Sequence, residues 1–120
     1  MSGENVEYFE NWTRQAKKGA LELCILNYLY SSGECYGYEM TKDLVAMPVG
    51  ITEGTIYPLL SRLRKQGLVN SRLKESAEGP ARKYYSLSES GKGTIILMNR
   101  YWKFLNESVY SVEVFKDEME

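Results

Sequence analysis

The cations between residues 52 and 87 are the side chains with the most distinctive chemistry. Seven lysines and arginines stand there against three glutamates, a net charge of +4, although the whole 120-residue chain carries −1. A local positive excess in an acidic chain attracts polyanions such as nucleic acid. The cations of this segment are Arg62, Arg64, Lys65, Arg72, Lys74, Arg82 and Lys83.

Catalytic and metal chemistry find little support in the residue types. The chain has no histidine and two cysteines, Cys24 and Cys35. No nucleophile–base pair, metal cluster or phosphate loop is visible by pattern, so we expect no enzyme activity and no cofactor. No apolar run approaches the ~20 residues of a membrane span, and the acidic start lacks a secretory segment. We therefore expect a cytoplasmic protein that is not bound to a membrane.

A helix is predicted to present part of the positive charge. Ile56, Leu59, Leu60 and Leu63 recur at helical spacing and define one apolar face, which leaves polar side chains exposed. Gly67 is expected to end this helix. Pro58 lies in the second turn if Thr52 is the cap and in the first turn if Thr55 is the cap, and the sequence leaves both open. The polar side chains off the apolar face are Thr55, Ser61, Arg62 and Lys65.

A hairpin is predicted to follow, with strands over 68–74 and 81–87 around a turn at 76–80. A shorter helix begins near Tyr36, with Met40, Leu44 and Val45 inward, and ends at Pro48 and Gly50. Two helices with a tight connection, followed by a hairpin with a basic tip, are typical of a winged helix-turn-helix. The predicted fold class is mainly α with a small β-hairpin.

The spacing of Leu21, Cys24, Ile25, Tyr28 and Leu29 predicts a helix over residues 16–31, the first in the chain. Lys17 and Lys18 would lie at its start, where an outside anion such as phosphate offsets the unfavourable helix dipole. Residues 5–15 hold large aromatics. Two interpretations stay open for them, a short helix on a neighbouring subunit and a frayed tail.

The last helix carries a long apolar seam. Ser88 is the expected N-cap. The spacing of three and four residues predicts a dimerisation helix, with packing against its own domain as the alternative. We therefore divide the chain into 1–87, the DNA-binding domain with its N-terminal helix, and 88–120, the dimerisation helix. The seam consists of Ile95, Met98, Trp102, Leu105, Val109 and Val112.

Several stretches together resemble the PadR family of bacterial transcriptional regulators. The similar stretches are Tyr36-Gly37-Tyr38-Glu39, residues 55–63, Gly67-Leu68-Val69 and residues 82–91, with the likeness running from about Gly19 to Gly91. The short terminal helix resembles the small subfamily that includes the lactococcal multidrug-resistance repressor. The resemblance implies a homodimeric repressor of efflux, stress or phenolic-acid detoxification genes. It also implies that Trp102 stacks on flat hydrophobic ligands at the dimer centre.

Residue types suggest how DNA would be held. Hydroxyls, cations and exposed amides at a helix start suit phosphates, which favours Lys17, Thr52, Gly54, Thr55 and Tyr57. The resemblance adds Tyr36 as a phosphate contact. Base reading would fall to Glu53, Ser61 and Arg62, and minor-groove contact to Arg82 and Lys83. For Tyr57 half-core packing competes evenly with DNA contact, and for Arg64, Lys65 and Arg72 we favour an ordinary solvated face.

Trp102 admits three interpretations: interface core, ligand platform, or both. Two such rings across a two-fold axis would form a flat slot for a planar aromatic effector. The candidate neighbours in a ligand site are Gly19, Glu22, Leu23, Asn99 and Asn106.

Three function classes are compared. The leading hypothesis is a homodimeric DNA-binding repressor that recognises a pseudo-palindromic operator and is released by a small hydrophobic or aromatic ligand. The second is a winged helix that binds another protein rather than DNA, which the near-neutral net charge and the acidic chain ends favour. The third, an enzyme, is disfavoured by the residue types.

Overall fold

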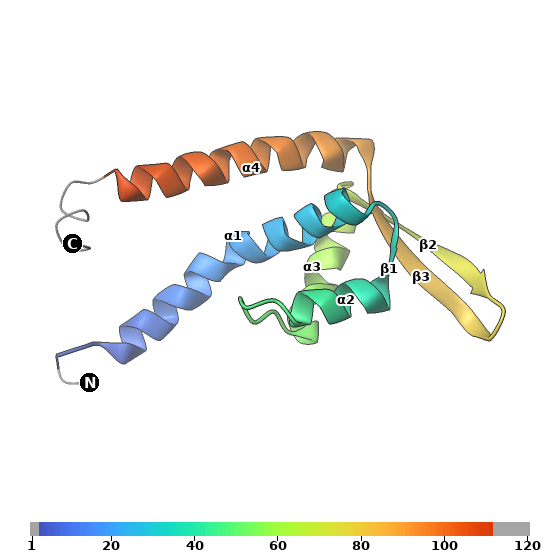
Figure 1. Ribbon diagram of the computed structural model, residues 1–120, viewed down its shortest axis with the longest axis horizontal. Coiled ribbons are helices and arrows are strands. Elements are labelled where there is room, and N and C mark those ends of the chain that lie inside the picture. Colours follow the sequence, from blue (N-terminus) through green and yellow to red (C-terminus); the bar gives the residue numbers. More distant parts are fainter. Residues whose placement is uncertain (1–2, 112–120) are drawn as a thin grey trace.

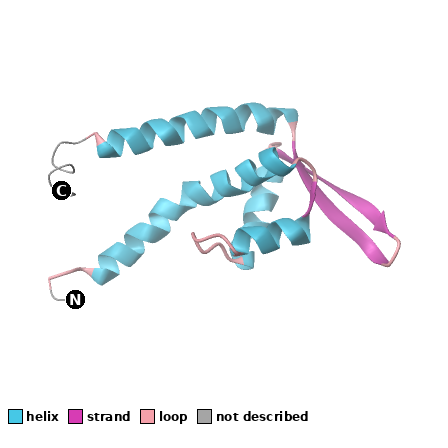
Figure 2. Ribbon diagram, viewed as in Figure 1, coloured by secondary structure: helices cyan, strands magenta, loops and turns pink. Residues whose placement is uncertain are grey.

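The computed structural model describes residues 3–111 and has the mainly α fold with a hairpin that the sequence predicts (Figures 1 and 2). Within this range the strands form one antiparallel sheet in the order β1-β3-β2. The elements in chain order are α1 (Val6–Ser32), β1 (Cys35–Tyr36), α2 (Gly37–Val45), α3 (Glu53–Lys65), β2 (Val69–Ser76), β3 (Gly79–Leu87) and α4 (Glu89–Tyr110).

The molecule is elongated, with extents of 59 × 33 × 23 Å. Figure 1 shows α2 and α3 packed beneath the second half of α1, with the β2–β3 hairpin projecting from one end. The start of α1 and the end of α4 extend together toward the opposite end. Among the described residues, no helix has the length and apolar character that a membrane crossing requires.

The core gathers where the helices meet the base of the hairpin. Every helix and both long strands contribute side chains to this core. The first and last elements of the winged domain are therefore packed on the same cluster. Burial of this apolar surface is the main force that fixes α3 and the hairpin relative to each other. The apolar residues exposed by 3% or less are Ile25, Leu26, Leu29, Met40, Leu44, Ile51, Ile56, Leu60, Leu63, Val69 and Ile95.

Helix α1 differs from the prediction because it is continuous from Val6 to Ser32. Asn5 caps it, with its side-chain oxygen accepting a 2.8 Å hydrogen bond from the backbone N–H of Tyr8. Neither a separate short helix nor a frayed tail describes residues 6–15. Lys17 and Lys18 therefore lie mid-helix, and the expectation that they face an unfavourable dipole at a helix start is wrong. Local spacing missed this because a cap upstream extends the helix through a polar stretch.

The two helices of the helix-turn-helix lie close to their predicted positions. Met40 and Leu44 are buried as expected, whereas Val45 is exposed at the helix end, which corrects its inward assignment. Thr52 is the N-cap of α3, so Pro58 falls in the second turn. The first turn is tight, since the Thr55 amide donates to the Thr52 carbonyl over 3.0 Å. Gly67 follows the helix end at φ +78°.

The hairpin is longer than predicted, because strand pairing continues to Ser76 and resumes at Gly79. Strand β1 was not predicted, since a helix was expected to begin near Tyr36. Cys35 pairs with Tyr85 and Tyr36 with Tyr84, which ties the end of α1 to the hairpin. Two residues carry too little periodicity to identify a strand.

A close approach joins the hairpin to α4. Ser88 is the N-cap, as predicted: its hydroxyl donates to the Gly67 carbonyl over 2.6 Å and accepts from the Gly91 amide over 2.9 Å. A Cβ built on Gly91 would lie 2.1 Å from the Leu68 carbonyl oxygen. Only glycine permits helix and backbone to meet this closely.

The predicted seam of α4 changes role along the helix. Ile95 is 1% exposed and belongs to the protomer's own core, so its assignment to a face that meets a second copy is corrected. Met98 is half-buried, while Trp102, Leu105 and Val109 are exposed. The remaining predicted seam residue, Val112, lies outside the described residues.

Candidate nucleic-acid interface

The start of α3 is open to solvent. Thr52, Glu53 and Gly54 are exposed, and Thr55 is half-buried. The hydroxyls of Thr52 and Thr55 lie 3.0 Å apart, and no side chain caps the first amides of the helix. Exposed amides at a helix start, next to hydroxyl groups, are able to bind a phosphate group. The predicted phosphate contacts of this helix are thus brought together.

Tyr57 is both anchored and accessible. Its hydroxyl accepts a hydrogen bond from the buried Thr41 hydroxyl over 3.4 Å, while 45% of the residue stays exposed. The two interpretations of this residue, half-core packing and surface contact, are therefore compatible in the structure. Ser61, one turn further along α3, is exposed.

Arg62 does not extend freely from α3, because its guanidinium forms an ion pair with Glu22 on α1. Both partners are candidate site residues, Arg62 for base reading and Glu22 for ligand binding. The ion pair holds Arg62 toward α1, so base contact requires that this pair first opens. The pair also links α1 directly to the exposed helix.

A basic groove runs between α1 and α3. It has a volume of about 590 Å³, and its lining includes Lys17, Thr55 and Arg62, which the sequence predicted for DNA contact. Arg14 and Lys18 line the same groove, but the sequence analysis did not assign them to a site. The signal was present, because residues three and four apart lie on one side of a continuous helix. The break assumed near residue 15 hid it.

The hairpin presents its two predicted cations together with Tyr36. The Arg82 guanidinium lies 4.9 Å from the centre of the Tyr36 ring, and the Lys83 ammonium lies 5.8 Å from that of Tyr85. Both cations are exposed. The β1–β3 pairing brings Tyr36 to the wing, so the tyrosine and the two cations, chosen on separate grounds, lie on one sheet.

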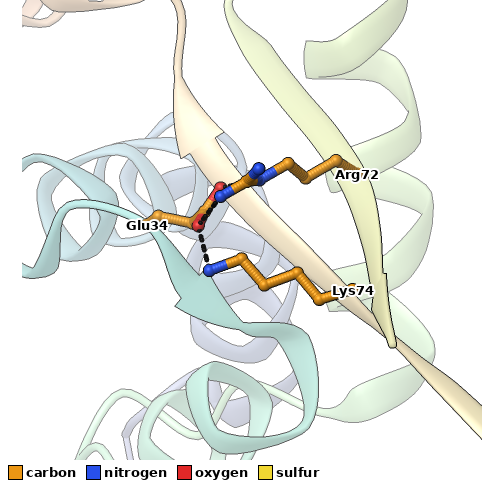
Figure 3. A network of polar contacts seen from close by, with 3 residues as sticks. All are labelled: Glu34, Arg72 and Lys74. Carbon is orange, nitrogen blue, oxygen red and sulfur yellow. Dashed lines mark hydrogen bonds and ion pairs between the residues drawn. The ribbon is translucent and has the colours of Figure 1, made fainter. Parts of the chain in front are cut away.

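Glu34 forms a cluster with two further wing cations (Figure 3). Its carboxylate accepts hydrogen bonds from Arg72 over 2.6 and 2.8 Å and forms an ion pair with Lys74 at 2.6 Å. Hydrogen bonds from these two cations lower the pKa of Glu34 to about 2. Arg72 is exposed, as predicted, and its guanidinium is engaged in this ion pair. Sequence spacing gave no sign of this contact, since the partners lie on different elements.

A second hollow lies between α1 and α4. It has a volume of about 420 Å³, and four residues of the predicted ligand site, Gly19, Glu22, Leu23 and Trp102, are among its lining. The sequence analysis did not assign Leu97 or Tyr101 to this ligand site. The complete lining is Gly19, Glu22, Leu23, Leu97, Met98, Tyr101, Trp102 and Leu105.

Asn99 belongs to the adjoining space. It lines a hollow of about 570 Å³ that shares Leu23 and Trp102 with the α1–α4 hollow just described. Its amide exchanges hydrogen bonds of 2.8 and 3.0 Å with the amide of Asn27 on α1. Asn106 lines neither of these two hollows. Asn27 was missed because its partner is remote in sequence.

The two cysteines add no charge to the basic groove or to the α1–α4 hollow. Cys24 and Cys35 are free thiols, and burial raises the pKa of each. Within residues 3–111, no group of three or more histidine, cysteine, aspartate or glutamate side chains is placed to hold a metal ion.

A helix-turn-helix with an exposed second helix and a basic hairpin defines the class of winged-helix DNA-binding proteins. The chain belongs to the PadR-like family of transcriptional regulators, whose family model matches residues 25–95. It is therefore a DNA-binding transcriptional regulator and not an enzyme. The alternative of a winged helix that binds only proteins is not favoured.

Solved structures support the assignment. The chain is 37% identical to a PadR-like transcription factor from Bacteroides fragilis, with a TM-score of 0.69 over 84% of this chain and 97% of that one. It is 38% identical to a PadR-like regulator from Bacillus cereus, with a TM-score of 0.69 over 81% and 94% of the two chains. A curated transcriptional regulator of Mycobacterium tuberculosis is 29% identical over 68% of this chain and 75% of the relative.

Proposed function

We propose that the protein is a homodimeric repressor that binds a pseudo-palindromic operator and is released by a planar aromatic ligand. The observation that carries this proposal is the exposed apolar face of α4, where Trp102 borders a hollow shared with α1. We further propose that the protein belongs with the small subfamily that includes the lactococcal multidrug-resistance repressor. We also propose that the DNA-binding domain ends at residue 87, that the dimerisation helix follows it, and that the protein is cytoplasmic.

DNA contact is proposed at two places. The start of α3 offers Thr52, Gly54 and Thr55 to a phosphate beside the major groove, and Tyr57 adds a hydroxyl. The wing offers Arg82 and Lys83, which suit the negative potential of a minor groove. The basic groove next to α3 extends this surface to Lys17. Glu53, Ser61 and Arg62 remain the proposed base-reading residues, with Tyr36 contacting phosphate.

Dimerisation is proposed through the outer half of α4. Leu105 and Val109 continue the line of Trp102, and all three are exposed in the protomer. Contiguous apolar surface of this kind marks an interaction site. A two-fold contact would place two wings at a fixed separation, which a pseudo-palindromic duplex requires.

Ligand binding is proposed in the α1–α4 hollow. Its exposed lining is overwhelmingly apolar, and its aromatic side chains, Tyr101 and Trp102, offer flat surfaces. Glu22 is its acidic group and also pairs with Arg62 of α3, so a ligand there would lie next to a contact of the DNA-binding helix. Asn99 and Asn106 are kept as neighbouring polar residues.

The DNA proposal is tested by binding at matched salt to a duplex that the wild-type protein selects from a random-sequence pool. Replacing Arg82 and Lys83 by Ala is expected to weaken binding and to reduce the salt slope by about 2, since two phosphate contacts are lost. Tyr57→Phe is expected to weaken binding through loss of one hydroxyl. Lys65→Ala, on the face assigned to solvent, serves as the control. If the Arg82/Lys83 double variant and Tyr57→Phe both bind like the wild type, the assigned contacts are wrong.

The ligand proposal is tested by fluorescence in a Trp12→Phe background, which leaves Trp102 as the only tryptophan. Titration with an acridine dye and, separately, with a hydroxycinnamic acid is expected to quench Trp102 and to release bound duplex at the same concentrations. Quenching without release would contradict ligand control of DNA binding.

A further inference from the structure

One face of the wing is crowded with positive charge. Side chains two apart on a strand share a face, so Arg72 and Lys74 of β2 lie on the same side. The strand register places Arg72 opposite Tyr84 and Lys74 opposite Arg82. Like charges directly opposite each other destabilise a hairpin. The wing therefore needs an anion on this face if Lys74 and Arg82 are to remain side by side.

Glu34 supplies that anion from outside the hairpin. It lies between the end of α1 and strand β1, and Figure 3 shows its carboxylate reaching both Arg72 and Lys74. Arg72 binds both carboxylate oxygens, over 2.6 and 2.8 Å, and Lys74 lies 2.6 Å from one of them. A bidentate guanidinium–carboxylate contact fixes orientation as well as distance.

Aromatic rings complete the same layer. The Lys74 ammonium lies 4.4 Å from the centre of the Tyr84 ring, and the Arg82 guanidinium lies 4.9 Å from that of Tyr36. The Tyr36 and Tyr84 rings are 5.6 Å apart. Cation–ring contacts add to the ion pairs and restrict both cations. Arg82, a proposed DNA contact, is thus held in the same layer of cations and rings whose positive charge Glu34 neutralises.

The base of the wing is held by the core, through Val69, Tyr85 and Leu87, and by the hydrogen bond from Arg64 to Ser71, but its outer part has few other restraints among the described residues. A two-stranded hairpin is marginally stable alone, and the third strand, β1, contributes only Cys35 and Tyr36. Beyond those pairs, both strands run outward to an exposed turn. Glu34 contacts β2, whereas β1 pairs with β3, so together they hold both strands of the hairpin to the end of α1.

We infer that Glu34 is a positioning residue for DNA binding, which fixes the wing so that Arg82 and Lys83 meet the duplex. The inference rests on the proposed wing contact. Charge alone leads to the opposite expectation, because an acid near a phosphate-binding surface repels DNA and its removal strengthens binding. The sign of the effect therefore separates positioning from simple electrostatics.

Glu34→Gln tests the sign against a matched control, Glu78→Gln. Glu78 is an exposed acid in the wing turn, so each variant loses one negative charge, Glu34→Gln at the base of the wing and Glu78→Gln at its tip. At matched salt and on the duplex selected by the wild type, Glu34→Gln is expected to weaken binding roughly fivefold, the upper range for a solvent-exposed ion pair. Glu78→Gln is expected to leave binding unchanged or tighter.

Hydrogen exchange of the free protein provides a readout that does not require DNA. The amides of Cys35, Tyr36, Tyr84 and Tyr85 are expected to exchange several-fold faster in Glu34→Gln and at the wild-type rate in Glu78→Gln. In a background where Arg72 and Lys74 are both Gln, adding Glu34→Gln is expected to change neither exchange nor binding. Circular dichroism establishes that each variant is folded.

The outcomes are distinguishable. Tighter or unchanged duplex binding by Glu34→Gln overturns the inference, and so does unchanged amide exchange. If the wild type selects no duplex, the proposed DNA contacts fail, and the exchange result by itself decides whether Glu34 positions the wing.

Discussion

Two regions of this protein use the same kind of helical pattern with different results. The head, residues 19–96, packs its apolar positions into one core. The arms, residues 6–18 of α1 and 97–110 of α4, leave theirs in solvent except for the half-buried Met98. Exposed large apolar residues of the arms are Val6, Tyr8, Phe9, Trp12, Leu97, Tyr101, Trp102, Phe104, Leu105, Val109 and Tyr110.

The difference shows what a periodic pattern does and does not mean. Ile95 and Trp102 occupy equivalent positions one heptad apart on α4, yet Ile95 is 1% exposed and Trp102 43% exposed. The pattern specifies a helix with an apolar face. Whether that face is covered depends on what lies opposite it. In the head the base of the hairpin covers the apolar face, and in the arms we propose that a second copy of the chain covers it.

The largest expected effect concerns the start of α4 in the head, where this helix meets the hairpin. Gly91→Ala would place a Cβ against the Leu68 backbone, so α4 or the start of β2 must shift. We expect a loss of about 3 kcal/mol in the free energy of unfolding, the upper range for overpacking. Gly93→Ala is the control, because no atom lies within 4 Å of its built Cβ and alanine favours a helix. Denaturant unfolding of both variants measures the difference, and equal stabilities would contradict a steric role for Gly91.

A smaller effect is expected in the arms themselves. Trp102→Ala is predicted to weaken self-association by about 2 kcal/mol, or roughly 30-fold, as truncation of a central aromatic does in protein interfaces. Leu73→Ala removes an apolar side chain of the wing that is more exposed than Trp102, 69% against 43%, and should leave association unchanged. Sedimentation over a concentration series measures both. A monomeric wild type at every concentration would remove the distinction proposed for the arms.

The smallest expected effect lies within the head and depends on pH. The Tyr28 hydroxyl donates to the Asp43 carboxylate over 2.6 Å, and this bond, together with burial, raises the pKa of Tyr28 to about 12 from an ordinary value of 10. Because the folded-state pKa is raised, the stabilisation is complete below pH 10 and is lost as the pH rises toward 12. We expect a contribution of about 1 kcal/mol.

Comparison with Tyr28→Phe checks this pH dependence. The variant should be less stable than the wild type near neutral pH, and the gap should close between pH 10 and 12. In the wild type, Tyr28 should contribute a late rise in tyrosinate absorbance as the pH approaches 12, and this rise should be missing from the variant. A constant gap across this range would show that the hydroxyl proton is not responsible.

Much of the head was predictable from its own residues. Helical spacing identified Ile56, Leu60 and Leu63 as the buried face of α3, and all three are buried. Ser88 was identified as a cap from its type and position. These predictions succeeded because the signals are local: a cap, a turn and an apolar period are all written within a few residues.

The candidate sites were predictable only in part. The wing cations and the start of α3 follow from residue type, but Glu34, Asn27 and the groove residues Arg14 and Lys18 were missed. Arg14 and Lys18 were missed because a break in α1 was assumed near residue 15. Glu34 and Asn27 act through partners that are distant in sequence, and no spacing rule connects such residues. Ile95 was misassigned for the same reason, since the core that covers it comes from other elements.

By itself the sequence determined the winged fold, because periodicity, caps and turn residues limit which elements form and in what order. Its motifs also indicated the family. Tertiary structure alone decided which charges remain available: Glu34 neutralises Arg72 and Lys74, and Glu22 engages Arg62, while Arg82 and Lys83 stay exposed on the wing. The physical reason is that a charge is defined by its residue, whereas its pairing depends on which side chains the fold brings within a few ångströms.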